Sequence, residues 1–244
     1  MACRGTLQLS LVFLGVFVCL QVSVAQDSSP ASEPEGRAAV GRLIEALGGA
    51  STVNAVRTLH QVMSIVQQGQ QTLVDQSISY PDKQIQLMRL PDGRHIRVVV
   101  TPEAAFWVSG AKVRELVSVQ RMGPDAALKH DFLNVLQHLN NPKYTFRATA
   151  KEKLGDVEAT VVEVNADGVS TRWWIGPDGR LLKEVSSDTG STGMKYLDWK
   201  NFGGLLYPTR YEIVDETGNP RFTMNLVTME VNAAIDPNIF KKPQ

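Results

Sequence analysis

The chain has 244 residues, of which 43% are hydrophobic, with 25 basic and 25 acidic side chains. This balanced charge gives no support for a nucleic-acid-binding protein or for a protein held on anionic membranes. Both cysteines, Cys3 and Cys19, fall in the first 25 residues, so the rest of the chain has no disulfide, thiolate metal site or cysteine nucleophile.

Residues 1–25 have the pattern of a secretory signal peptide. A positive charge precedes an apolar stretch over 9–20, and Ser23-Val24-Ala25 is a small-x-small cleavage signal. The apolar stretch is too short to span a bilayer comfortably, although an uncleaved anchor is the alternative. We therefore expect export to the periplasm, cleavage before Gln26 and a polar, disordered lead-in over 26–36.

Three helical segments and five strands are predicted in the first part of the mature chain. A helix over 37–47 has its apolar residues on one face and ends at Gly48-Gly49, and a short helical segment follows from Ser51. A longer helix is predicted over Pro124–Leu139 from its apolar stripe. The five strands, separated by turn residues, cover Thr58–Val66, Leu73–Tyr80, Lys83–Leu90, Arg94–Thr101 and Ala104–Val108.

The segment from Lys143 to Val231 is predicted to form an unbroken antiparallel meander of about seven strands. Apolar and polar residues alternate, and Asp-Gly pairs such as Asp178-Gly179 supply the positive φ of tight hairpins. No strand–helix–strand repeat indicates a parallel sheet. We therefore predict an α+β fold in which one curved antiparallel sheet, an unclosed half-barrel of about 11–12 strands, wraps around two or three helices in a single domain over 37–244.

The order of elements and four passages of the sequence resemble the LolA-like lipoprotein-carrier family. This family includes LolB and the mycobacterial lipid-binding lipoproteins. The four passages span nearly the whole mature chain. They are Leu47-Gly48-Gly49 with Val56-Arg57-Thr58-Leu59, Ser79-Tyr80-Pro81-Asp82-Lys83, Ala105-Phe106-Trp107-Val108, and the ending Val231-Asn232 through Ile235-Asp236-Pro237-Asn238-Ile239-Phe240-Lys241-Lys242-Pro243.

In that family an unclosed β-barrel and a helical lid enclose an apolar cavity, which holds the acyl chains of a lipoprotein or another lipid crossing the periplasm. The resemblance therefore implies a non-catalytic periplasmic carrier, with a membrane-bound donor or acceptor protein as a further partner. The proteobacterial carrier has an arginine immediately before the proline of the strand–proline–strand passage, where it ties the lid and gates release. The matching residue of this chain is Tyr80.

A carrier needs a concave, apolar, water-poor lining, and methionine thioethers suit irregular chains. We expect this cavity between the sheet and the helix over 124–139. The same residues would also fill a solid core, and sequence alone leaves both interpretations open. The expected lining residues are Met63, Ile65, Ile78, Ile85, Leu87, Val98, Val100, Phe106, Phe132, Leu136, Trp173, Tyr196, Tyr211, Phe222, Met224 and Leu226.

The sequence gives no pattern for catalysis, a cofactor or a metal site. The histidines His60, His95, His130 and His138 show no zinc spacing, and no pair of carboxylates is placed by spacing for acid–base chemistry. An enzyme is therefore not expected. The expected partners are a lipid or an acylated protein, not nucleic acid, and the expected state is a monomer.

The alternative function is a periplasmic protein-interaction or sensor domain on the same fold, as in the RseB-type sensors, with a solid core. An exposed apolar patch around Trp174 or Trp199 would favour it. Adjacent strand residues point to opposite faces, so Trp173 and Trp174 cannot both enter one core. We expect one of them in the core and the other lying across a neighbouring strand.

Overall fold

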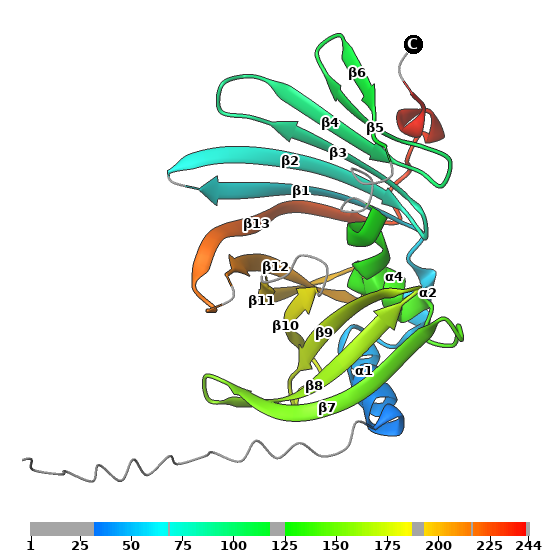
Figure 1. Ribbon diagram of the computed structural model, residues 1–244, viewed down its shortest axis with the longest axis vertical. Helices are drawn as coiled ribbons and strands as arrows, with labels where there is room; N and C mark the ends of the chain where they lie inside the picture. The colour runs from blue at the N-terminus through cyan, green and yellow to red at the C-terminus, as the bar shows by residue number, and fades with distance from the viewer. Residues whose placement is uncertain (1–31, 68, 118–124, 187–192, 216, 243–244) are drawn as a thin grey trace, which may run out of the picture.

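The computed structural model describes residues 32–67, 69–117, 125–186, 193–215 and 217–242. The predicted signal peptide and residues 26–31 lie outside this part of the chain. One 13-stranded antiparallel sheet dominates the molecule, in the order β6-β5-β4-β3-β2-β1-β13-β12-β11-β10-β9-β8-β7. The sheet curves around the helices and does not close, because β6 and β7 end it without pairing (Figure 1). The predicted unclosed half-barrel is thus confirmed.

The first half of the sheet consists of six strands joined in sequence, one more than predicted. The added strand, β6, is short, all four of its residues are exposed, and it lacks the alternation that marks the others. The bounds are β1 Thr58–Gln67, β2 Gln70–Ser79, β3 Lys83–Arg89, β4 His95–Val100, β5 Ala105–Ser109 and β6 Lys112–Glu115.

The predicted seven-stranded meander forms the second half. Its last strand returns to pair with β1, from Leu59 opposite Val231 to Val66 opposite Thr223, and this pairing joins the two halves into one sheet. The bounds are β7 Tyr144–Leu154, β8 Val157–Ala166, β9 Val169–Ile175, β10 Leu181–Ser186, β11 Gly193–Phe202, β12 Leu205–Val214 and β13 Pro220–Val231.

The first helix, α1 (Glu33–Ala46), begins four residues earlier than predicted. Ser32 caps it by accepting a hydrogen bond from the Glu35 backbone N–H, and Pro34 suits the first turn, where its missing N–H is no loss. The expected disordered lead-in is therefore wrong over 33–36. The buried face of α1 packs on β7, where Gly36 lies directly against the backbone of Phe146.

The predicted helix over 124–139 is interrupted. Residues 125–130 are helical, and α4 (Phe132–Gln137) follows after Asp131, which has extended ψ. Asp131 separates the two helical segments. It caps α4, because its Oδ1 accepts a hydrogen bond of 3.1 Å from the Asn134 backbone N–H. Pro124 lies outside the described residues. Two further short elements are α2 (Ala50–Ala55) and the 3-10 helix η1 (Pro237–Phe240).

The main core lies between the concave face of the sheet and the helices. Leu43 of α1 and Leu133 of α4 are fully buried in it, together with Phe146 and Trp173 from the meander. The other tryptophan, Trp174, is 3% exposed and packs with Ala159 and Val161 on the convex face. As expected, Trp173 therefore lies in the main core, and Trp174 lies on the other face against a neighbouring strand.

Candidate functional site

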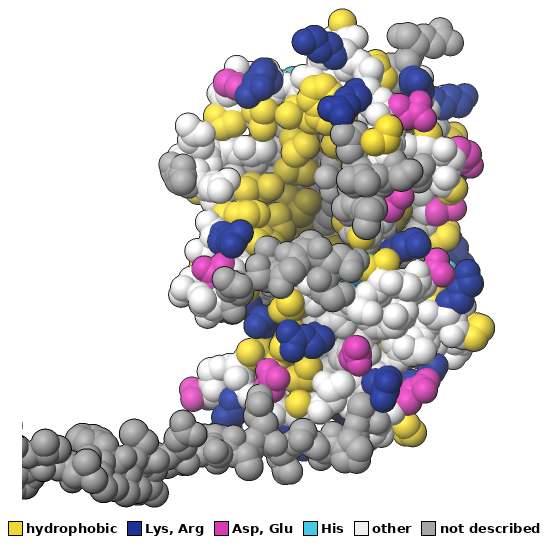
Figure 2. Space-filling model, viewed as in Figure 1, with side chains coloured by type: hydrophobic (Ala, Val, Ile, Leu, Met, Phe, Trp, Pro, Cys, Tyr) yellow, Lys and Arg dark blue, Asp and Glu magenta, His cyan; other side chains and the backbone are white. Residues whose placement is uncertain are grey.

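The concave face of β1–β5 and β13 forms a groove. Residues paired directly across an antiparallel sheet share a face, so the register assigns each side chain to one side. Gln61, for example, lies opposite Gln76 on one side and Met229 on the other, and all three share the face of the buried Leu59. Figure 2 shows a hollow lined by hydrophobic side chains over these strands.

No charged side chain lies on the groove face within these six strands. The register of β1 against β13 shifts between Val62 and Met63. This bulge places Leu226, Met224 and Phe222 of β13 on the groove face. The charged residues of these strands all lie on the convex face. They are Asp75, Lys83, Arg89, Arg97, Arg221 and Glu230.

All five methionines in the described part of the chain face the concave side of the sheet. Met63 and Met88 flank Val74 across β1–β3, and Met224 pairs with Ile65 of β1. The other two are Met194 and Met229. Their unbranched, polarisable side chains let a lining adapt to ligands of irregular shape. Such a concentration on one face is a property expected of an adaptable apolar site.

The expected lining residues divide into three groups, the first of which lies in the groove. These side chains face the concave side and are half-buried or, for Met63, 9% exposed. Five further residues, which were not predicted from the sequence, line the same concave face. They are Val74, Met88, Ile96, Trp107 and Met229. The expected residues in this group are Met63, Ile65, Val98, Phe222, Met224 and Leu226.

The second group fills the core instead. α4 and its neighbours cover this end of the concave face, and the Phe132 ring packs against Tyr196 and Tyr207 at centroid distances of 5.8 and 5.3 Å. Each side chain is at most 5% exposed. They are Ile78, Val100, Phe132, Leu136, Trp173, Tyr196 and Tyr211. The concave face is therefore core at one end and groove at the other.

The third group, Ile85, Leu87 and Phe106, lies on the convex face, so the expectation that they line the cavity is wrong. In β3 the register places Gln84, Gln86 and Met88 on the groove face. Ile85 and Phe106 belong to a second apolar cluster, which the C-terminal segment covers with Ile235, Ile239 and Phe240. Because both faces of β3 bury apolar side chains, its alternation did not reveal which face is concave.

A buried acidic and tyrosine-rich cluster lies where the groove meets the core. Glu184 of β10 faces the concave side beside Trp173 and Met194, and it accepts a hydrogen bond from Tyr196. Its side chain is partly exposed, but Oε2 is buried and has no hydrogen-bond partner among the described residues. Burial raises the pKa of Glu184 to about 7, and the hydrogen bond from Tyr196 offsets only part of this effect.

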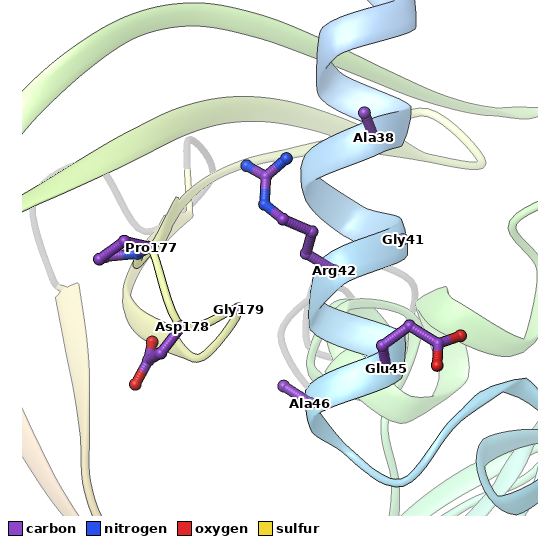
Figure 3. Close-up of a pocket in the computed structure, with 8 residues that line it drawn as sticks. All are labelled: Ala38, Gly41, Arg42, Glu45, Ala46, Pro177, Asp178 and Gly179. Carbon is purple, nitrogen blue, oxygen red and sulfur yellow. The ribbon is translucent and has the colours of Figure 1, made fainter.

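Surface depressions elsewhere on the described part of the chain do not combine an apolar lining with a buried carboxyl group. One, of about 490 Å³, lies between α1 and the turn that joins β9 to β10 (Figure 3). Arg42 reaches from the helix toward this turn, whereas Glu45 points away from it. Asp178 in the turn pairs with Arg180 at 3.2 Å. The depression is shallow and its charges are solvated. The described residues also contain no group of three or more potential metal ligands.

No family model and no curated protein matches the sequence. Solved structures do match. A LolA superfamily protein of Nitrosomonas europaea is 12% identical and aligns over 85% of this chain and 98% of its own, with a TM-score of 0.57. An outer-membrane lipoprotein-sorting protein domain of Vibrio parahaemolyticus is also 12% identical, over 86% and 97%, with a TM-score of 0.57. The chain has the LolA-like fold.

A DUF1329 family protein of Desulfovibrio piger has this fold too, at 11% identity over 84% of this chain and 97% of its own and a TM-score of 0.56. Within the LolA-like fold of this chain, Tyr80 directly follows β2, and its hydroxyl donates to Asp131 Oδ1 at 2.9 Å. Tyr80 thus contacts Asp131, the residue that caps α4. No described helix is long and apolar enough to cross a membrane.

Proposed function

We propose that the chain is a periplasmic carrier that binds the acyl chains of a lipid or of an acylated protein in the groove of β1–β5 and β13. One observation supports this most strongly, the separation of charge between the two faces of these strands. A groove that only contacted water would gain nothing from excluding every charge, whereas a charge against hydrocarbon is strongly unfavourable. Each methylene buried there would contribute roughly 0.8 kcal/mol.

Other observations support the same ligand class. The methionine-rich lining suits chains of irregular shape, and a lipoprotein-sorting domain shares the fold. The signal-peptide pattern of residues 1–25 supports export as part of this proposal. Delivery to a membrane-bound acceptor and a non-catalytic role are parts of the proposal. The alternative, a protein-interaction domain, was expected to expose an apolar patch at Trp174 or Trp199. The Trp174 indole is 3% exposed and donates to Glu152 Oε2 at 2.8 Å. Trp199 is half-buried and packs against the main core.

The first experiment is native mass spectrometry of the protein purified from a periplasm without detergent. A discrete added mass that organic extraction removes, and that proves to be a lipid, supports the proposal. If the protein carries no such mass and also fails to bind added phospholipid and lipopeptide, the carrier function is rejected.

A matched pair of variants then locates the binding site. Ile96 of β4 lies in the groove and Leu87 of β3 lies on the convex face, and both side chains are half-buried. We expect Ile96→Asp to abolish lipid retention, because it places a carboxylate against the acyl chain, and Leu87→Asp to retain it. Thermal unfolding of both variants controls for general destabilisation. Equal lipid retention in the two variants would place the ligand outside the groove.

A further inference from the structure

A row of glutamines crosses the inner end of the groove. Gln61 of β1, Gln76 of β2 and Gln86 of β3 lie directly opposite one another on three adjacent strands, about 4.8 Å apart. Gln84 lies on the same face of β3, one alternation nearer to the core. Four neutral amides on one face of three strands are unusual for an apolar lining, since each buried amide needs hydrogen-bond partners.

The row does not satisfy its own hydrogen-bonding groups. Gln61 Nε2 donates to Gln76 Oε1 at 2.5 Å, whereas Gln61 Oε1 is buried and has no partner among the described residues. Gln61 is 4% exposed and Gln76 is 7% exposed. Rotating both amides reverses the bond and leaves a donor on Gln61 instead of an acceptor. In either arrangement one buried polar atom of Gln61 has no hydrogen-bond partner among the described residues.

Another glutamine of this chain shows what a purely structural amide looks like. Gln137 of α4 donates through Nε2 to the backbone carbonyls of Val53 and Val56, at 3.0 and 2.8 Å, and so ties α4 to α2. Gln84 and Gln86 make no side-chain hydrogen bond to any described residue. The row therefore differs from an amide that holds the fold together.

We infer that the glutamine row binds the neutral carbonyl linkage of an acylated ligand, an amide or an ester, while the acyl chain lies along the methionine-lined part of the groove. This inference rests on the proposed function. The row is uncharged, and no cation lies on its face of β1–β5 and β13 to balance a carboxylate. A neutral amide or ester can hydrogen-bond with the row, whereas a free fatty acid would bring a charge into a site that has no counter-charge. The ligand class is thus a lipid or protein whose chain is attached through a carbonyl linkage.

The test compares two probes of equal chain length, palmitamide and palmitate, at slightly alkaline pH, where palmitate is ionised. Each probe competes with a fluorescent apolar dye for the purified protein. We expect palmitamide to bind about tenfold more tightly than palmitate. In the double variant Gln61→Met and Gln76→Met, which replaces the interacting pair by apolar side chains of similar length, the preference should fall to about twofold or less.

Gln71→Met is the matched control, because Gln71 is exposed on the opposite face of β2 and donates to Ser64 Oγ instead. It should keep the full preference. If both probes bind the native protein and the double variant with an unchanged preference, the row has a structural role and the inference is wrong. If neither probe displaces the dye from the native protein, the proposed carrier function fails, which is a different outcome.

Discussion

The hydroxyl of Tyr80 donates a 2.9 Å hydrogen bond to Oδ1 of Asp131, and this bond joins the residue after β2 to the N-cap of α4. The same Oδ1 atom accepts from the Asn134 backbone N–H. Burial raises the pKa of Asp131, and the hydrogen bonds from Asn134 and Tyr80 offset part of this effect. One carboxylate thus begins the helix and anchors it to the sheet.

Tyr80→Phe should therefore destabilise the protein by about 1–3 kcal/mol, because it leaves a buried carboxylate oxygen with one donor fewer. Urea unfolding followed by circular dichroism measures this change. Tyr144→Phe is the control, since the hydroxyl of Tyr144 makes no hydrogen bond to any described residue. A loss of stability as large in Tyr144→Phe as in Tyr80→Phe would show that the bond contributes nothing specific.

Two glycines of α1 should respond in opposite directions to alanine. A Cβ on Gly36 would lie 2.4 Å from the carbonyl oxygen of Phe146, so Gly36→Ala must push α1 away from β7. We expect a loss of about 1–3 kcal/mol in the free energy of unfolding. A Cβ on Gly41 meets nothing within 4 Å, so Gly41→Ala should stabilise the helix by about 0.5–1 kcal/mol.

The comparison uses the same unfolding assay for both variants. Because the two sites share one helix, a general effect of alanine on α1 would move both in the same direction. A neutral Gly36→Ala would mean that the close packing of α1 on β7 is not maintained in solution.

The C-terminal segment should contribute to stability through Phe240, which is 7% exposed and packs with Val99 and Phe106 on the convex face. Phe240→Ala should cost about 3–5 kcal/mol, because it leaves a cavity in this cluster. Lys241→Ala, at the next and exposed position, should change stability little. Differential scanning calorimetry would separate these outcomes, and equal melting temperatures would show that the segment is not held against the sheet.

The sequence predicted the architecture well where local signals are strong. Alternation and the Asp-Gly turns gave the seven strands of the meander, and Gly179 adopts the expected positive φ of +81°. Pairing between β1 and β13 was not predicted, because no local signal links strands so far apart in the chain. The break at Asp131 was also missed, since its hydrogen bond with Tyr80 is a long-range contact.

The candidate site was harder to predict than the fold for two physical reasons. Alternation gives two faces but not which one is concave, and β3 buries Ile85 under the C-terminal segment while Met88 faces the groove. Apolar patterns also cannot tell a filled core from an open groove. Trp173 and Met224 were expected to be equivalent, yet the first is fully buried and the second is half-exposed. The glutamine row carries no apolar signal at all.

Glu184 should make stability fall as the pH rises. The pKa of the folded-state carboxyl is raised to about 7 from an ordinary 4.5, so between these values the folded protein holds a proton that the unfolded chain has lost. Linkage then requires the free energy of unfolding to be largest below this window and to decrease through it. Because the side chain is partly exposed, we expect about 1–3 kcal/mol of this dependence.

Glu184→Gln should remove that loss, because the amide stays neutral throughout. Urea unfolding of both proteins at about pH 5 and about pH 8 measures the difference, with Glu163→Gln at an exposed position of β8 as the control. In the control the decrease with pH should persist, since the buried carboxyl at position 184 is retained. A native protein whose stability is unchanged or rises between these pH values, or a Glu184→Gln variant that keeps the native slope, would show that this carboxyl is ionised and well solvated in the folded state.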